Sequence, residues 1–142
     1  VTRMDRCRAP EEGDMIMANP VEVIPLSNEL VFDDGRAVEY VPGTTYTLAI
    51  NGPHPGGAEH LLHASQGQFS ESDGAFIKCK GQVAAWMGVA TNRSVQWSAP
   101  LAKPLGTVVL TLGSAHGYGP VSLYTLNLTQ SKSTWASRSH EF

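Results

Sequence analysis

The sequence predicts an all-β domain, and the first observation behind this prediction is the distribution of glycine and proline. The 142-residue chain contains 14 glycines and 9 prolines spread along its length, which leaves few windows long enough for a stable helix. The second observation is that several segments alternate apolar with smaller or polar residues at the two-residue period of a β-strand. With 42% hydrophobic residues, a chain of this length is expected to bury one core rather than two.

The three clearest strands lie in the middle and towards the end of the chain. In residues 45–50, large apolar side chains alternate with smaller ones. Residues 107–112 are rich in β-branched residues and have apolar residues on both faces, so we expect a central, well-covered strand there. Residues 121–129 divide into an apolar face with Tyr124, Leu126 and Leu128 and a more polar face with Thr125, Asn127 and Thr129.

Shorter segments are expected to complete two sheets. Residues 21–25 and 29–32 resemble edge strands, since Pro25 cannot continue a ladder and a turn sequence follows Phe32. Residues 82–87 contain alanines that favour helix but are too few for a stable one, so they are interpreted as strand or loop. Further short strands are expected at residues 61–62, 75–77 and 94–97. We therefore predict a two-sheet antiparallel β-sandwich of the immunoglobulin-like kind, with about seven to nine strands, over residues 1–130.

Charge and hydropathy argue against two classes of partner. The net charge is −3 and basic residues are interspersed with acidic ones, so there is no basic stripe for nucleic acid. No apolar run approaches the roughly 18 residues that cross a bilayer, and the first residues lack the apolar segment of a signal peptide. We expect a soluble chain that, if secreted, is already processed. Residues 131–142 are polar apart from Trp135 and are expected to form a tail, a linker or a cloning remnant.

Two cysteines and two glycosylation motifs point to the secretory pathway. Cys7 and Cys79 fit no metal motif, and a bridge between them would close a loop of about 70 residues and contribute roughly 4 kcal/mol. The alternative is a pair of buried thiols in a cytosolic protein. Asn92-Arg93-Ser94 and Asn127-Leu128-Thr129 are acceptor sequences for N-linked glycans, which are added only in that pathway. We therefore expect a secreted or cell-surface glycoprotein.

Four features occur in order along the chain. The first is Cys7 ahead of Asn19-Pro20, and the second is Tyr40-Val41-Pro42-Gly43-Thr44-Thr45-Tyr46 at the entry to a strand. The third is His60-Leu61-Leu62-His63-Ala64-Ser65 followed by Gly74-Ala75-Phe76 and Cys79, and the fourth is Val95-Gln96-Trp97-Ser98-Ala99-Pro100. Together they resemble the reeler domain, an extracellular β-sandwich. Gly56-Gly57-Ala58-Glu59 departs from the family pattern, which usually has an aromatic-glycine-aromatic approach there.

The resemblance implies a disulfide between Cys7 and Cys79 and a non-enzymatic recognition or adhesion module of matrix, cell-surface or defence type. Its partner is expected to be an extracellular protein or a glycan, or a second copy of the chain. No catalytic residue is expected, because Ser65, Ser98 and Ser114 lack the Gly-x-Ser-x-Gly elbow of a nucleophile. The acidic residues lie in turn sequences without the spacing of a calcium loop.

A metal- or haem-binding redox accessory domain is the first alternative function, although no cofactor is the main expectation. His54, His60, His63 and His116 are weak candidates for a copper or zinc site. If residues 60–63 form a strand, however, His60 and His63 point to opposite faces and cannot bind one ion together. Methionine with histidine is a known haem ligand pair, and the chain offers Met4, Met15, Met17 and Met87.

A carbohydrate-binding module is the second alternative. His116 and Tyr118 lie among glycines in residues 114–120, which together with residues 51–58, including His54, could form one end of the sandwich. The simpler interpretation is that both segments are ordinary connections between strands. Trp97 is expected in the core, whereas Trp86 or Trp135 is expected to be exposed enough to anchor a partner or stack on a sugar.

Overall fold

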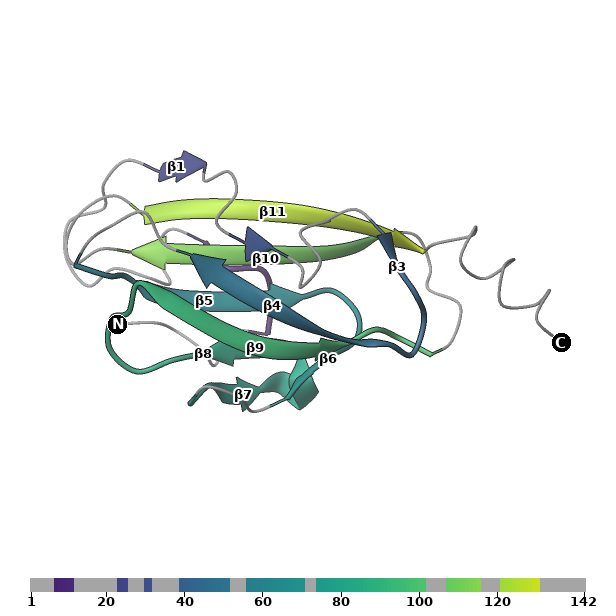
Figure 1. Ribbon diagram of the computed structural model, residues 1–142. Helices are drawn as coiled ribbons and strands as arrows, with labels where there is room; N and C mark the ends of the chain where they lie inside the picture. Colours follow the sequence, from purple (N-terminus) through teal and green to yellow (C-terminus); the bar gives the residue numbers. More distant parts are fainter. Residues whose placement is uncertain are drawn as a thin grey trace, which may run out of the picture.

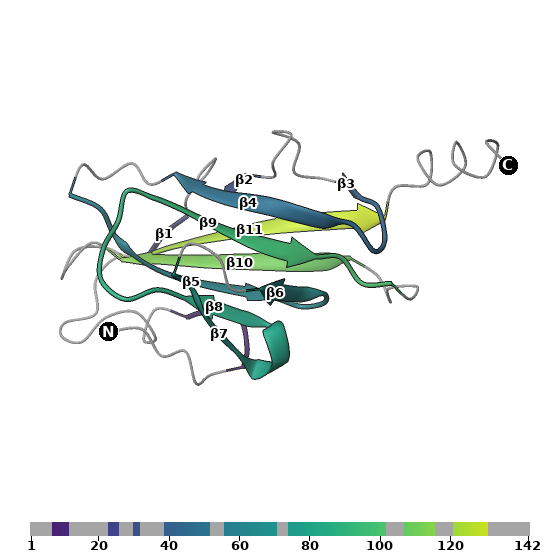
Figure 2. The same ribbon diagram turned by 60° about the horizontal axis from the view of Figure 1, so that its bottom comes forward.

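Two stacked β-sheets make up the computed structural model of this chain (Figures 1 and 2). Within the part of the chain that the structure describes, no helix is long and apolar enough to span a membrane. The described residues are 7–11, 23–25, 30–31, 39–51, 56–70, 74–101, 107–115 and 121–130.

One sheet has seven strands and the other has four. Neighbouring strands are antiparallel, except that β1 and β3 each pair in parallel with β11. The predicted two-sheet sandwich is therefore confirmed. The larger sheet runs in the order β1 (Val23–Pro25), β11 (Val121–Gln130), β10 (Val108–Ala115), β5 (Glu59–Ala64), β8 (Val83–Ala85) and β7 (Phe76–Lys78), with β3 (Glu39–Tyr40) also on β11. The smaller sheet runs in the order β2 (Leu30–Val31), β4 (Thr45–Asn51), β9 (Asn92–Ser98) and β6 (Gln68–Ser70).

The long strands form where the sequence alternates. In β4 the inward positions Leu48 and Ile50 are buried, and in β9 the inward positions are occupied by Arg93, Val95 and Trp97. Strand β10 lies between β11 and β5 and is buried at nearly every position, as expected for a central strand. Because the period of the sequence matches the pleat, each of these strands places its large side chains between the two sheets.

The described residues contain eleven strands rather than seven to nine. The difference comes from short elements. Residues 82–87, interpreted as strand or loop, contribute β8, and the sequence did not predict β3 or β6, which have only two and three residues. The expected edge strands are confirmed, since β1 and β2 each lie at the border of a sheet.

The core between the sheets is built around Trp97, which is fully buried as predicted. Its ring meets Tyr40 edge to face at 5.9 Å and stacks on Tyr46 at 6.2 Å between centroids. The indole Nε1 donates a hydrogen bond of 3.0 Å to the carbonyl of Gln66, so its polar atom is satisfied inside the core. These contacts hold the turn before β6 against the end of β9.

A second, smaller apolar cluster lies on the outer face of the seven-stranded sheet. It contains Leu61, Val83, Ala85 and Ala115, and Cys79 packs against it. Residues 7–11, purple in Figure 1, pass behind β5 and β8 on the side that faces away from β4 and β9. Cys79 begins the short 3-10 helix η2 (Cys79–Gly81).

The disulfide between Cys7 and Cys79 holds this N-terminal segment against the outer face. Its two half-cystines are 72 positions apart in sequence, and the predicted pairing is confirmed. Among the described residues there is no free cysteine. Closing a loop of this length contributes about 4 kcal/mol in the chain-entropy description, which is large for a domain of this size.

Candidate binding surface at one end of the sandwich

The core is polar at the end of the sandwich where β4 and β10 end and β5, β9 and β11 begin, on the left in Figure 1. In the seven-stranded sheet, Ser114 pairs with His60 on one side and with Ser122 on the other, and all three are buried. Arg93 of the four-stranded sheet is 8% exposed and takes an inward position of β9. A row of polar side chains thus replaces the aliphatic ones found deeper in the core.

Arg93 joins three parts of the chain at this end. Its Nε donates to Nδ1 of His60 at 2.8 Å, and its Nη2 donates to the carbonyl of Gly88 at 2.7 Å and to that of Ala58 at 3.3 Å. The guanidinium carbon lies 5.3 Å from the ring centroid of Trp86, which is a cation–π arrangement. Because Nδ1 of His60 accepts from Arg93, it is the ring nitrogen without a proton.

The turn between β8 and β9, residues 86–91, is held from the inside by these contacts. Ala58 and Ala90 form an isolated β-bridge with two backbone hydrogen bonds of 3.0 and 3.1 Å. The approach requires glycine at position 57, because φ there is +83° and a Cβ would lie 2.9 Å from the backbone of Ala90. The turn therefore has a fixed backbone conformation rather than that of a free loop.

Two apolar side chains project from this fixed turn into solvent. Met87 is 79% exposed and Val89 is 56% exposed. They lie on either side of Gly88, whose carbonyl accepts a hydrogen bond from Arg93. This arrangement was not predicted from the sequence. The signal was available, because Arg93 has the same parity in its strand as Val95 and Trp97 and so had to point inward.

Trp86 does not have the exposure expected of it. It is only 4% exposed, because it packs in the core and under the guanidinium of Arg93. It cannot stack on a sugar in this conformation, and it acts instead as part of the support for the turn. The other proposed ligand contacts, His54, His116 and Tyr118, lie outside the described residues, as do Trp135, Met4, Met15 and Met17.

The histidines of β5 separate as the strand period predicted. His60 is fully buried between the sheets, whereas His63 lies on the outer face and is partly exposed. Burial lowers the pKa of His63 below its ordinary value of 6.5, because desolvation disfavours the imidazolium. No group of three or more His, Cys, Asp or Glu side chains in the described parts of the chain is arranged to hold a metal ion.

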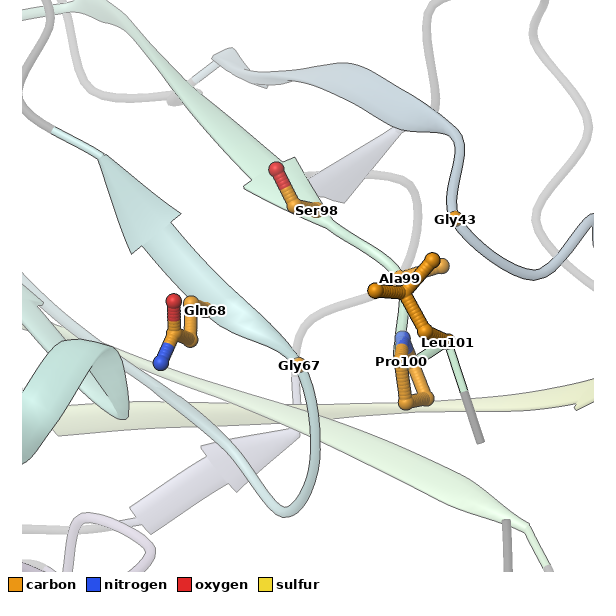
Figure 3. A pocket seen from close by; sticks show the side chains of 7 residues that line it. All are labelled: Gly43, Gly67, Gln68, Ser98, Ala99, Pro100 and Leu101. Carbon is orange, nitrogen blue, oxygen red and sulfur yellow. The ribbon is translucent and has the colours of Figure 1, made fainter. Parts of the chain in front are cut away.

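A hollow of about 480 Å³ lies at the opposite end, beside the turns that precede β4 and β6. The side chains of Ala99, Pro100 and Leu101 gather on one side of it, and Gln68 stands on the other (Figure 3). Leu101 is 86% exposed. The lining contains no titratable side chain. It consists of Gly43, Gly67, Gln68, Ser98, Ala99, Pro100 and Leu101.

The acceptor asparagines of both glycosylation motifs are exposed and lie on strands. Asn92 is the first residue of β9, and Asn127 is near the middle of β11. Asn92 faces outward from the four-stranded sheet, because Arg93 next to it faces the core. Asn127 faces outward from the seven-stranded sheet, because Leu126 and Leu128 on either side are buried.

Comparison with solved structures identifies a related fold. No protein-family model and no curated protein matches the chain. The human F-spondin reeler domain matches with a TM-score of 0.55 and 18% identity, over 75% of this chain and 92% of that one. A DUF4466 family protein from Parabacteroides merdae matches with a TM-score of 0.41 and 14% identity, over 75% of this chain and 46% of that one.

The first of these matches shows that the chain has a reeler-like fold, as the sequence motifs predicted. The disulfide and this fold are compatible with an extracellular location.

Proposed function

We propose that this chain is a non-enzymatic extracellular recognition module, of the matrix, cell-surface or defence type, and that it contacts a partner protein through the turn between β8 and β9. Support for the extracellular setting comes from the Cys7–Cys79 disulfide and the reeler-like fold. The observation that carries the choice of surface is the exposure of Met87 and Val89 on a backbone that Arg93 holds from the core.

The turn is preorganised for binding. A flexible loop loses conformational entropy when it binds, at about 0.5–1.5 kcal/mol for each immobilised side chain, in addition to the cost of ordering its backbone. Here the backbone is already ordered by the Ala58–Ala90 bridge and by the hydrogen bond from Arg93 to Gly88. Burying a methionine and a valine side chain against a partner contributes on the order of 1.5–3 kcal/mol each. The turn is therefore suited to contact an apolar depression on another protein.

The experiment compares two variants that remove exposed apolar side chains from opposite ends of the sandwich. Met87→Ser/Val89→Ser changes the turn, and Leu101→Ser changes the rim of the hollow, where the leucine is even more exposed. Each immobilised protein is incubated with extracellular fluid of the source tissue, and captured proteins are quantified by mass spectrometry. We expect at least one protein to be captured by the native chain and by Leu101→Ser but lost, about tenfold or more, with the double variant.

An opposite pattern would contradict the choice of surface. If every captured protein survives Met87→Ser/Val89→Ser and is lost with Leu101→Ser, recognition takes place at the hollow. Circular dichroism and thermal unfolding of both variants serve as the control, because exposed substitutions of this kind are expected to change stability by no more than about 0.5 kcal/mol.

A further inference from the structure

Both glycosylation motifs lie on strands, and their acceptor asparagines face solvent from opposite sides of the sandwich. We propose that Asn92 and Asn127 both carry N-linked oligosaccharides, so that each sheet has a glycan on its outer face. The proposal rests on the proposed extracellular function, because the transfer takes place in the secretory pathway.

The case for Asn127 is its position in the alternation of β11. Leu126 and Leu128 are 8% and 0% exposed, whereas Asn127 and Thr129 are exposed on the other face. The two buried leucines fix the rotation of the strand, so the amide of Asn127 cannot turn into the core. Its cross-strand neighbour on β10 is Val109, which is only partly buried, and an attached sugar therefore displaces no core side chain.

The case for Asn92 has the same form. Its neighbour Arg93 is held in the core by hydrogen bonds to His60, Ala58 and Gly88, which fixes the outward direction of Asn92. In β4, the residue paired with Asn92 is Asn51, which is also exposed. In both motifs the middle residue is buried and the hydroxyl residue, Ser94 or Thr129, shares the outer face with the asparagine.

The reaction is a group transfer without oxidation or reduction. Nδ2 of the asparagine forms a bond to the anomeric carbon of a lipid-linked oligosaccharide, the bond from that carbon to the diphosphate oxygen breaks, and the amide loses one proton. The lipid diphosphate is the leaving group. The folded structure is compatible with the product at both positions, because both asparagines are exposed.

Glycans at these two positions would shield the outer face of each sheet and leave the edges and ends of the sandwich for protein contacts. Asn92 follows Val89 by only three positions, so its glycan borders the β8–β9 turn.

The test is to secrete the full chain from a mammalian cell line behind a cleavable leader and to measure its intact mass before and after peptide N-glycosidase. We expect the mass to fall by two oligosaccharides. The mass should fall by only one oligosaccharide in Thr129→Ala and in Ser94→Ala, each of which keeps its asparagine. If either of these variants fails to fold, Asn127→Gln or Asn92→Gln gives the same measurement. Asn51→Gln is the matched control, because Asn51 is exposed beside Asn92 but is followed by Gly52-Pro53, and it should keep both glycans.

Each outcome bears on one of the two proposals. A secreted, disulfide-bonded protein whose mass the enzyme does not change overturns the glycan proposal and leaves the proposed function intact. If the mass of the native chain falls by only one oligosaccharide, the proposal is overturned for one sheet. A chain that is retained in the cell with two free thiols instead overturns the extracellular function. Loss of both glycans in Asn51→Gln would show that the substitutions act on folding, which also overturns the assignment.

Discussion

Replacing Gly67 with alanine tests how closely the turn before β6 packs against Trp97 beside the hollow. A Cβ at this position would lie 2.5 Å from the carbonyl oxygen of Ser98 and 2.6 and 2.7 Å from Nε1 and Cε2 of Trp97. The backbone also has φ of +81°, which costs an L-residue about 1–2 kcal/mol. Overlap with the tryptophan adds about 1–3 kcal/mol, and losing the Trp97–Gln66 hydrogen bond adds about 1 kcal/mol more. We expect Gly67→Ala to destabilise the fold by roughly 3–6 kcal/mol.

Gly88→Ala is the matched control for this prediction. Its φ is +74°, but no atom lies within 4 Å of the added Cβ, so only the backbone cost of about 1–2 kcal/mol applies. At about 2–4 °C for each kcal/mol, the two variants should differ in Tm by roughly 10 °C. Thermal and urea unfolding followed by tryptophan fluorescence measure the difference. Equal losses of stability in the two variants would refute the claim that contact with Trp97, rather than backbone conformation, demands glycine at position 67.

Two further predictions concern the outer face of the seven-stranded sheet. Burial lowers the pKa of His63, so the unfolded chain binds this proton more readily than the folded chain does. The free energy of unfolding should therefore decrease as pH falls below 6.5, and His63→Gln should flatten this dependence in urea titrations between pH 7 and about pH 5; an unchanged slope would contradict this account. Replacing both Cys7 and Cys79 with serine should lower the free energy of unfolding by about 4 kcal/mol. The double variant should also bind more of a hydrophobic dye, because the disulfide no longer holds the N-terminal segment against the cluster around Leu61. A decrease in the free energy of unfolding below about 1 kcal/mol would be inconsistent with this account.

Most of the sandwich could be predicted from the sequence because its long strands carry their own pattern. In β4 and β11 six or more residues alternate, and in β9 residues 94–97 do, so the period identifies both the strand and its inward face. Strand β10 is instead recognised by β-branched and apolar residues on both faces, as a central strand requires. Strands β3 and β6 have too few residues to show a period. They exist because β11 and β9 offer them backbone partners, which is information about the fold rather than about the local sequence.

The candidate surface was harder to predict, for a physical reason that Trp86 illustrates. A tryptophan that follows three small buried residues and precedes an exposed methionine can lie on either side of the sheet. Its ring packs in the core and lies under the guanidinium of Arg93, which comes seven positions later and belongs to the other sheet. Local sequence does not show such a contact between sheets. The inward position of Arg93, by contrast, follows from strand parity once the strand is extended from residues 94–97 back to Asn92.

The buried arginine itself connects the fold to the proposed function. Removing a guanidinium from water costs several kcal/mol, and a well-packed apolar side chain at the same place often gives equal or greater stability. Stability alone therefore does not account for an arginine at this inward position. An apolar side chain, however, could not donate hydrogen bonds to the carbonyls of Gly88 and Ala58 and to Nδ1 of His60. Arg93 thus fixes the position of one turn relative to β5, and that turn is the one that presents Met87 and Val89 to solvent.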